Sequence, residues 1–573
     1  MAIVAASLAA LALPAAASAH AVLEESQPSR GDQVSRAPER VVLRFDEPVE
    51  VAFGSVRVYD ARGHRVDSGS TQHPGGSGDA VAVDLRRGLG DGVYTVTYRV
   101  ISADSHPVAG GFTFTVGAGG AAPTSSVADL IDAGRAGPVT EAAFGVVRAL
   151  SYLAIALAAG ALVFVLAVWQ PALSGLAGTS EAWHDARHAF AARARAIALA
   201  AVSLGAVCSA LGLPLQGATA GATSVWGAFD LNVLGDVIGT RFGTVWTLRV
   251  VAFAALGTLI ALAGFGSGAR ERPILIGGAA ALAAFLCLTP ALAGHASTVD
   301  PRAVLLPANF VHVSAMAVWV GGVATLLLAV PAATRRLAPP ERTSVLALTV
   351  TRFSTVAIVA VAALVASGIA QAIPELESLS DFTNTAFGRA LLAKIVLLLL
   401  LLGLGAWNRQ RARPRLTRLA ARHEPPGETG ALLRRSLRAE ALLMVAVLGV
   451  AAALVSYPPP SSARGPFADK LDLGPARLEL TVDPARPGAN ELHMYLFRRS
   501  DGAQYDRVKE LRVSASLPDK QIGPLHLRAE KAGPGHYVVR RATVAPAGDW
   551  KLELDARVSK FDAYRAEVEV PIK

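Results

Sequence analysis

The sequence has few of the residues that mark several common classes of protein. Only two of its 573 residues are cysteine, Cys208 and Cys287, and both stand in apolar runs, so we expect neither a disulfide framework nor a thiolate metal motif. Charged residues make up 17% of the chain and hydrophobic residues 52%, a composition too apolar for a set of soluble domains. We therefore predict a protein that lies largely in a membrane.

Two further absences narrow the function. No segment has the Gly-x-x-x-x-Gly-Lys-Ser/Thr pattern of a nucleotide-binding loop, so ATP is not an expected partner. No stretch interleaves basic and aromatic residues, so nucleic acid is not an expected partner either. We interpret the net charge of +9 as a signal of membrane orientation.

Residues 1–19 have the character of a signal peptide, although Lys and Arg are missing from the start. They are apolar and end in Ala17-Ser18-Ala19, a small-residue pattern that signal peptidase cleaves. Cleavage would make His20 the first residue, and its free α-amine and imidazole could then chelate one metal ion. The alternative is an uncleaved anchor helix, for which the run is short because a span needs roughly 20 residues.

Residues 20–117 predict an all-β sandwich. Short runs of β-branched and aromatic residues alternate with polar ones at 41–45, 55–59, 93–100 and 111–116, and turn-forming clusters separate them. Between the last two runs, Asp104 and His106 alternate, so both side chains point to one side of an extended backbone. Together with His20 they form a nitrogen-rich ligand set, which suits Cu(II) better than the softer Cu(I).

The same residues carry a family resemblance. The segments 20–23, 43–48 and 98–107 resemble the periplasmic copper-binding protein CopC. The resemblance implies that His20, Asp104 and His106 bind Cu(II) and that Glu47 lies near the site. CopC proteins with a Cu(I) site use a methionine-rich loop, whereas residues 20–117 contain no methionine, so this domain resembles the Cu(II)-only type.

A linker at 118–139 leads to a membrane domain at 140–458. Eight apolar runs are long enough to span a bilayer, at 146–168, 194–215, 245–265, 274–293, 305–330, 353–373, 390–407 and 441–457. The loops after the odd-numbered runs hold most of the arginines, nine of them between residues 409 and 438. The positive-inside rule therefore predicts a multi-pass membrane protein, in contact with membrane lipid and with both termini outside the cytoplasm. The resemblance to CopC implies that this membrane is the bacterial inner membrane.

The membrane domain contains a short internal repeat. Gly243 of Thr240-Arg241-Phe242-Gly243 precedes Arg249 by six residues, and Gly388 of Thr385-Ala386-Phe387-Gly388 precedes Lys394 at the same interval. The repeat predicts two four-helix halves in parallel orientation, a plan that transporters use. For Arg249 and Lys394 we expect either snorkelling to the headgroups or pairing with acids in an outer vestibule.

Three residues of the membrane domain are candidate copper ligands. His295 stands at the outer end of the fourth run, His312 lies about two turns into the fifth, and Met316 follows on the same helical face. Together they could bind Cu(I) or Cu(II) near the outer leaflet. The alternatives are that His295 caps a helix and that Met316 fills a packing gap.

The membrane domain also resembles a copper family. The segments 294–296 and 385–389, together with His312, the run 319–322 and Lys394, resemble the copper-resistance membrane protein CopD. Fusions of a CopC-like domain to a CopD-like domain occur among bacterial copper-uptake proteins. The resemblance therefore implies a link to copper more strongly than it implies a direction of transport.

Residues 459–573 predict a second all-β sandwich, with alternating runs at 476–482, 491–497, 536–539 and 550–554. Its pattern resembles YtkA-like domains. His493 and Met494 are neighbours on a strand and must face opposite sides, so they cannot easily bind one ion together. Whether His493, His526 or His536 form a second copper site stays open.

We predict a multi-domain copper-handling protein rather than an enzyme. The outer sandwich captures Cu(II) and passes copper to or through the eight-helix domain, with an extracytoplasmic copper chaperone as a partner. Two alternatives remain. One is a copper sensor or chaperone anchor that does not transport, and the other is a membrane enzyme that uses copper or haem in a redox reaction.

Overall fold

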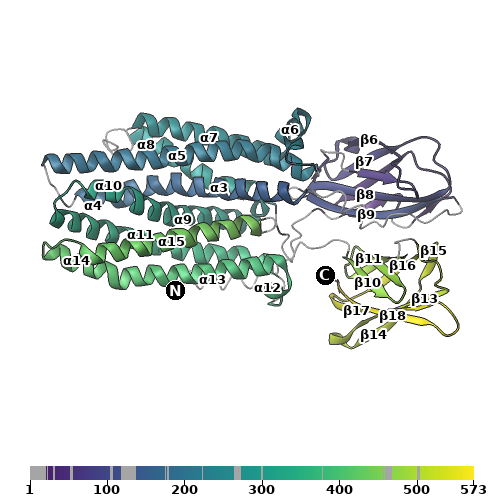
Figure 1. Cartoon of the computed structure of the whole chain (residues 1–573). Coiled ribbons are helices and arrows are strands. Elements are labelled where there is room, and N and C mark those ends of the chain that lie inside the picture. Colours follow the sequence, from purple (N-terminus) through teal and green to yellow (C-terminus); the bar gives the residue numbers. More distant parts are fainter. Residues whose placement is uncertain are drawn as a thin grey trace. The chain divides into compact units, whose positions relative to one another are not determined.

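The chain forms an N-terminal β domain, a helical domain and a C-terminal β domain, as predicted (Figure 1). The computed structural model describes residues 21, 23–29, 32–51, 56–102, 107–117, 137–174, 176, 180–221, 223–263, 273–298, 301–376, 379–455, 457, 467–499 and 504–572. The predicted signal peptide at 1–19 lies outside these residues.

The N-terminal domain has two sheets. One has the strand order β1-β3-β7-β6 and the other β2-β9-β8-β4, with β5 also paired to β8. All four predicted runs form strands. The strands are β1 (Leu23–Gln27), β2 (Gln33–Val34), β3 (Arg40–Phe45), β4 (Val49–Glu50), β5 (Val56–Tyr59), β6 (Asp67–Gln72), β7 (Ala80–Leu85), β8 (Gly92–Ser102) and β9 (Pro107–Val116).

Alternate side chains of these strands fill one core. Val41, Leu43 and Phe45 of β3 are buried, while Arg44 between the last two is exposed. Phe45 packs edge-to-face on Tyr98 of the other sheet, with 5.6 Å between the ring centroids. Most of the strands that the pattern missed are short or polar: β2 and β4 have two residues each, and β6 is an edge strand without a large apolar side chain. The exception is β7, which has six residues and is buried at every position except Asp84.

Within the described residues, eight helical segments are long and apolar enough to span a membrane, which confirms the predicted number. Several contain more than one helix. The helices are α3 (Pro138–Val163), the π-helical η2 (Phe164–Trp169), α4 (Gln170–Ser174), α5 (Glu181–Ala220), α6 (Leu231–Ile238), α7 (Arg241–Ala263), α8 (Pro273–Leu292), α9 (Arg302–Leu328), α10 (Val330–Thr334), α11 (Pro339–Ala372), α12 (Asp381–Asn384), α13 (Ala386–Trp407), the π-helical η7 (Asn408–Ala412), α14 (Arg413–Ala421) and α15 (Gly427–Leu454).

Several helices extend well beyond the predicted apolar runs. The largest difference is in α5, which has 40 residues where the apolar run covers 194–215. Its first part is polar in composition, but Trp183, Ala186, Phe190 and Ala194 recur at helical spacing and are all buried. This part is an amphipathic helix, which a search for continuous apolar runs does not detect.

Helices α3 and α9 cross at two glycines. A Cβ atom on Gly160 would collide with the carbonyl oxygen of Ala317, and one on Gly321 would collide with that of Ala156. The contact is reciprocal because each helix presents Ala-x-x-x-Gly to the other, and such small residues let helix backbones approach closely in a membrane. The first helix of each predicted half therefore meets its counterpart through the same pair of positions.

The Thr-x-Phe-Gly repeat has one local structure in both halves. The Thr240 hydroxyl accepts a hydrogen bond of 3.0 Å from the backbone N–H of Gly243, and Thr385 accepts one of 2.9 Å from Gly388. In both copies, a Cβ atom on the glycine would collide with the short helix that precedes it, α6 or α12. The same Thr–Gly hydrogen bond thus stands at the start of α7 and of α13. Together with the reciprocal crossing of α3 and α9, this match supports two parallel four-helix halves.

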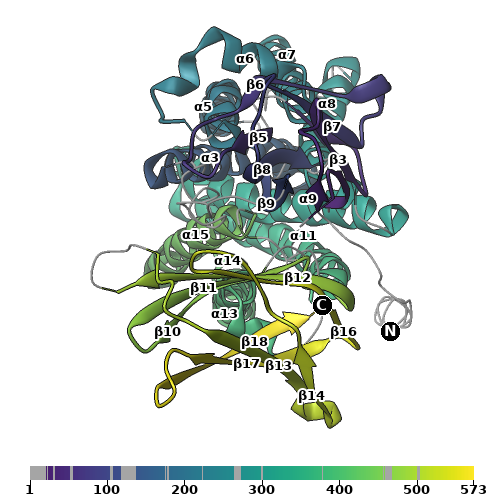
Figure 2. The same ribbon diagram turned by 90° about the vertical axis from the view of Figure 1, so that its right-hand side faces the viewer.

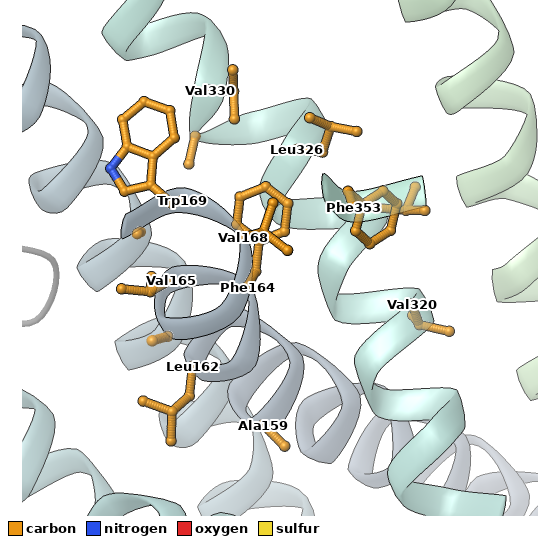
Figure 3. Close-up of a cluster of buried hydrophobic side chains, with 14 of the residues drawn as sticks. Ala159, Leu162, Phe164, Val165, Val168, Trp169, Val320, Leu326, Val330 and Phe353 are labelled. Atoms are coloured by element: carbon orange, nitrogen blue, oxygen red, sulfur yellow. The ribbon is translucent and has the colours of Figure 1, made fainter. Parts of the chain in front are cut away.

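A large apolar cluster lies near the π-helical segment η2. Figure 3 shows Phe164, Val168 and Trp169 of this region together with Leu326 of α9 and Phe353 of α11. The Phe164 and Phe353 ring centroids are 5.8 Å apart. These side chains belong to the first, fifth and sixth spanning segments and pack in one cluster.

The C-terminal domain is a second two-sheet sandwich, with sheet orders β10-β11-β12-β16-β15 and β14-β13-β17-β18 (Figure 2). Leu480, Met494 and Trp550 are among its buried core residues. Its strands include all four predicted runs and are β10 (Phe467–Leu473), β11 (Ala476–Asp483), β12 (Gly488–Arg498), β13 (Glu510–Leu517), β14 (Ile522–Leu527), β15 (Glu530–Gly533), β16 (His536–Val544), β17 (Gly548–Arg557) and β18 (Ala563–Ile572).

The glycine crossing gives a test of the helical packing. Gly160→Ala should destabilise the membrane domain by about 1–3 kcal/mol, because the added methyl group overpacks a backbone contact. The measurement is the thermal unfolding midpoint of the full chain in detergent. Gly403→Ala in α13 is the matched control, since a Cβ atom there has no neighbour within 4 Å. Equal midpoints for the two variants would contradict the close crossing.

Candidate functional site

The predicted copper ligands of the N-terminal domain fall largely outside the described residues. His20, Asp104 and His106 all do so, and they stay predictions. The strands that flank them are described, as is Glu47. Where these flanking strands lie shows whether the fold can bring the predicted ligands together.

The flanking strands meet at one end of the sandwich. Leu23 at the start of β1 pairs with Phe45 at the end of β3. Ser102 at the end of β8 pairs with Val49 of β4. The start of β1, which follows His20 in the sequence, and the end of β8, which precedes Asp104, therefore both lie next to the short connection between β3 and β4.

Glu47 lies in that connection. It stands between Phe45, which pairs with β1, and Val49, which pairs with β8. Glu47 is half-buried, and its Oε1 atom is fully inside the protein. The fold thus puts Glu47 at the end of the sandwich from which both predicted ligand segments leave.

A second carboxylate lies beside this connection. The backbone N–H groups of Phe45 and Val49 donate to the carbonyl oxygens of Asp79 and Gly78, at 2.8 and 2.9 Å. Asp79 accepts hydrogen bonds from the Ser77 hydroxyl and from Arg44. The Ser77 bond, supported by Arg44, holds the pKa of Asp79 below its usual value, and the Asp79 carboxylate forms an ion pair with Arg44 at 3.2 Å.

In the membrane domain, His312 of α9 faces α11. Its Nδ1 atom lies 3.1 Å from the carbonyl oxygen of Leu364 and 3.2 Å from the Ser367 hydroxyl. A carbonyl only accepts hydrogen bonds, so this geometry assigns the proton to Nδ1 and leaves the Nε2 lone pair for a ligand. The backbone of His295 lies in the turn His295–Ser297, and its side chain is outside the described part of the molecule.

Met316 is partly buried and packs against the apolar cluster of the helical domain. This contact agrees with the packing alternative and leaves its role as a ligand a prediction.

Sequence reasoning missed other polar residues that adjoin His312. Asn309 Nδ2 donates to Gln371 Oε1 at 2.8 Å, and Gln371 Nε2 donates to the Ser367 carbonyl oxygen at 3.0 Å. We call Asn309, His312, Ser367 and Gln371 the polar seam between α9 and α11. Polar groups inside a membrane are costly, so a seam of this kind indicates a function.

Two charged residues extend the seam. The Lys394 ammonium of α13 interacts electrostatically with Glu375, just beyond the end of α11, and also acts on His312. A pattern in the sequence could have identified the polar residues that α11 contributes to the seam. Ser367, Gln371 and Glu375 recur every four residues, which puts them on one helical face.

The first half has a simpler version of this arrangement. Ser151 stands nine positions before Gly160, as His312 stands nine positions before Gly321. Arg249, which the repeat aligns with Lys394, donates to Thr289 at 2.9 Å and to Ser151 at 3.4 Å. Arg249 is only 1% exposed, so neither snorkelling nor an outer vestibule describes it. Its guanidinium lies over the Trp246 ring instead, 4.5 Å from the centroid.

The C-terminal histidines separate into a pair and a single residue. His493 Nδ1 lies 3.2 Å from His536 Nε2, whereas His526 is exposed on β14 in the other sheet. Met494 lies in the core, which confirms that it cannot share an ion with His493. Burial, together with nearby His493 and Arg540, holds the pKa of His536 well below its usual value, so its ring is neutral.

Among the described residues, no group of three or more His, Cys, Asp or Glu side chains is arranged to hold a metal ion. A complete centre at the N-terminal domain therefore depends on His20, Asp104 and His106.

Comparisons with known families match three parts of the chain. Residues 23–117 match the model of the CopC domain. Residues 139–301 match the N-terminal domain model of copper resistance protein D-like proteins, and residues 347–454 match the model of copper resistance protein D. The resemblance of the C-terminal domain to YtkA-like domains stays a prediction.

One relative is similar along nearly the whole chain. The copper transport protein CutJ of Bacillus subtilis (strain 168) is 31% identical over 563 residues, which are 96% of this chain and 95% of that protein. The copper resistance protein C of Escherichia coli is 32% identical over 106 residues, which are 18% of this chain and 83% of that one.

Among solved structures, CopC from Methylosinus trichosporium OB3b is 33% identical and covers 17% of this chain and 93% of its own, with a TM-score of 0.16.

The polar seam gives a test of how its helices are held together. Gln371→Leu should lower the unfolding free energy by on the order of 1 kcal/mol, because it leaves the Asn309 amide buried without its acceptor. Asn309→Leu together with Gln371→Leu should recover most of that loss, since both partners are then apolar. Thermal unfolding of the full chain in detergent measures both effects, and a double variant less stable than Gln371→Leu would contradict the contact.

Proposed function

This chain belongs to the family of copper proteins that join a CopC domain to a CopD membrane domain, and on that premise we propose that it captures Cu(II) outside the cytoplasm and passes copper into its membrane domain. Membership of the family makes it a multi-pass membrane protein of copper transport or resistance. The capture, the hand-over and the residues that perform them are the proposal.

The main support for the capture step is that β1 pairs with the end of β3 and that the end of β8 pairs with β4, at one end of the N-terminal domain. The pairs Leu23–Phe45 and Val49–Ser102 tie the two predicted ligand segments to the connection that holds Glu47. At this end, the α-amine and imidazole of His20 would bind Cu(II) together with Asp104 and His106, and Glu47 would lie beside them. Nitrogen and oxygen donors without a thioether favour Cu(II) over Cu(I).

The polar seam supports the hand-over step. His312 keeps Nε2 free for a ligand because its Nδ1–H donates to α11. His295 and Met316 would complete a site for Cu(I) or Cu(II) there, and Lys394, which interacts with Glu375, acts electrostatically on His312. The first half has Ser151 at the equivalent position, so the copper step belongs to the second half.

The proposal also covers the topology of the chain, the removal of its signal peptide and its partner. Both termini lie outside the cytoplasm, the signal peptide is removed, and an extracytoplasmic chaperone can deliver the copper. We assign no catalytic reaction to the chain.

The capture site is tested on the mature protein. N-terminal sequencing should find His20 as the first residue, and His20→Ala should weaken Cu(II) binding by at least about tenfold, because the imidazole is lost and the remaining α-amine can no longer close a chelate ring with it. Isothermal titration of the full chain measures the affinity. The matched control is His64→Ala, because His64 is an exposed histidine of the same domain that pairs with Asp60 at 3.4 Å. A different first residue, or unchanged binding by His20→Ala, would refute the site.

The hand-over site is tested in cells limited for copper. His312→Ala should reduce copper accumulation to the level of a strain without the protein, because the seam loses its only imidazole. His526→Ala, which changes an exposed histidine of β14, should accumulate copper normally. Elemental analysis of washed cells gives the readout. Normal accumulation in the strain without the protein would instead support a sensor or chaperone anchor.

A further inference from the structure

One sheet of the C-terminal domain has polar side chains on the face opposite the core. Along β12, Leu492, Met494 and Leu496 point into the core. Their neighbours Glu491, His493 and Tyr495 lie on the other face by strand alternation, yet they too are buried. A buried row of this kind differs from the usual polar outer face of a sandwich.

Strand pairing brings His536 of β16 onto the same face. His536 lies directly opposite Tyr495 and diagonally across from His493, which pairs with Val538. The Tyr495 and His536 rings stack with centroids 4.2 Å apart, and the two imidazoles lie nearly parallel at 5.5 Å. The pair is thus fixed by the register of two adjacent strands.

Glu491 interacts electrostatically with His493, at a distance too long for a hydrogen bond. Its Oε1 atom lies 3.6 Å from His493 Nε2, on the side of the ring away from His536. A carboxylate beside one nitrogen favours the proton there and leaves the lone pair on the other. His493 Nδ1 therefore directs its lone pair toward His536 Nε2.

A hydrogen bond between the histidines does not satisfy this group of side chains. If His536 donates from Nε2, its Nδ1 atom is a bare acceptor, and Nδ1 has no hydrogen-bond partner among the described residues. The Tyr495 hydroxyl and Glu491 Oε1 are likewise buried without a hydrogen bond in that part of the chain. Unsatisfied polar atoms are costly inside a protein, and water molecules bound to an ion between the two imidazoles could give these three atoms partners.

We propose that His493 and His536 bind a Cu(II) ion through Nδ1 and Nε2, with Glu491 as the residue that positions His493. Metal–nitrogen bonds of about 2.0–2.1 Å across the 3.2 Å separation give an angle of roughly 100° at the ion, within the range of common copper geometries. Met494 faces the core, so the site offers nitrogen and oxygen donors only. Divalent copper binds such donors more tightly than zinc does.

This site does not depend on the capture site of the N-terminal domain. It gives the second β domain a copper function of its own and uses two of the three histidines in that domain. His526, exposed on the other sheet, has no part in it.

The test uses the full chain in detergent after the other candidate copper ligands have been removed. His20, His106, His295 and His312 are replaced by Ala. So are His184 and His188, whose rings lie 4.3 Å apart on α5 and could chelate copper. After incubation with Cu(II) and desalting, mass spectrometry gives the bound copper and electron paramagnetic resonance gives its nitrogen ligands. We expect one Cu(II) per chain with two imidazole nitrogens.

Variants in this background identify the ligands. His493→Asn and His536→Gln put an amide near the position of each ligating nitrogen and keep its hydrogen-bonding capacity, so we expect folded chains that lose the Cu(II). His526→Asn is the matched control and should retain it. The proposal is overturned if the parent background binds no Cu(II), if its spectrum lacks two imidazole nitrogens, or if His536→Gln and His526→Asn bind equally. The parent result decides the question even if a variant fails to fold.

Discussion

The close approach of α3 and α9 is the constraint on which the membrane domain depends. Gly160 and Gly321 each face the backbone of the other helix at a distance that excludes any side chain. Hydrophobic burial gives no net drive for helix association in lipid, so such backbone contacts hold a bundle together. Because the contact is reciprocal, it also aligns the two halves, and His312 then takes the place that Ser151 has in the first half.

The two halves share a framework but differ in chemistry at this position. In the first half, the Arg249 guanidinium donates hydrogen bonds to the hydroxyl groups of Ser151 and Thr289. In the second half, the His312 imidazole lies in the polar seam between α9 and α11 and interacts electrostatically with Lys394 of α13, which also interacts with Glu375. A duplicated scaffold can keep one half for support while the other half acquires a binding site, and our proposal assigns the copper step to the second half.

Local sequence patterns predicted the elements well, and the contacts between them less well. Eight apolar runs and eight alternating β runs identified the three domains because burial imposes a fixed period on each kind of element. The pairing of His493 with His536 could not be predicted, since it depends on the register between strands 43 residues apart. The Asn309–Gln371 contact likewise depends on which faces of α9 and α11 meet. His20, Asp104 and His106 stay predictions, because the strand ends at Leu23, Phe45, Val49 and Ser102 place only the segments that lead to them.

The central claim is that copper captured by the first domain passes through the helices. The most direct measurement is copper entry into liposomes that contain the purified mature chain, followed with a copper-sensitive dye trapped inside. Copper added outside should enter these liposomes faster than it enters protein-free liposomes or liposomes that carry the His312→Ala chain. Equal entry in all three would contradict transport through the membrane domain, even if the first domain binds Cu(II) tightly.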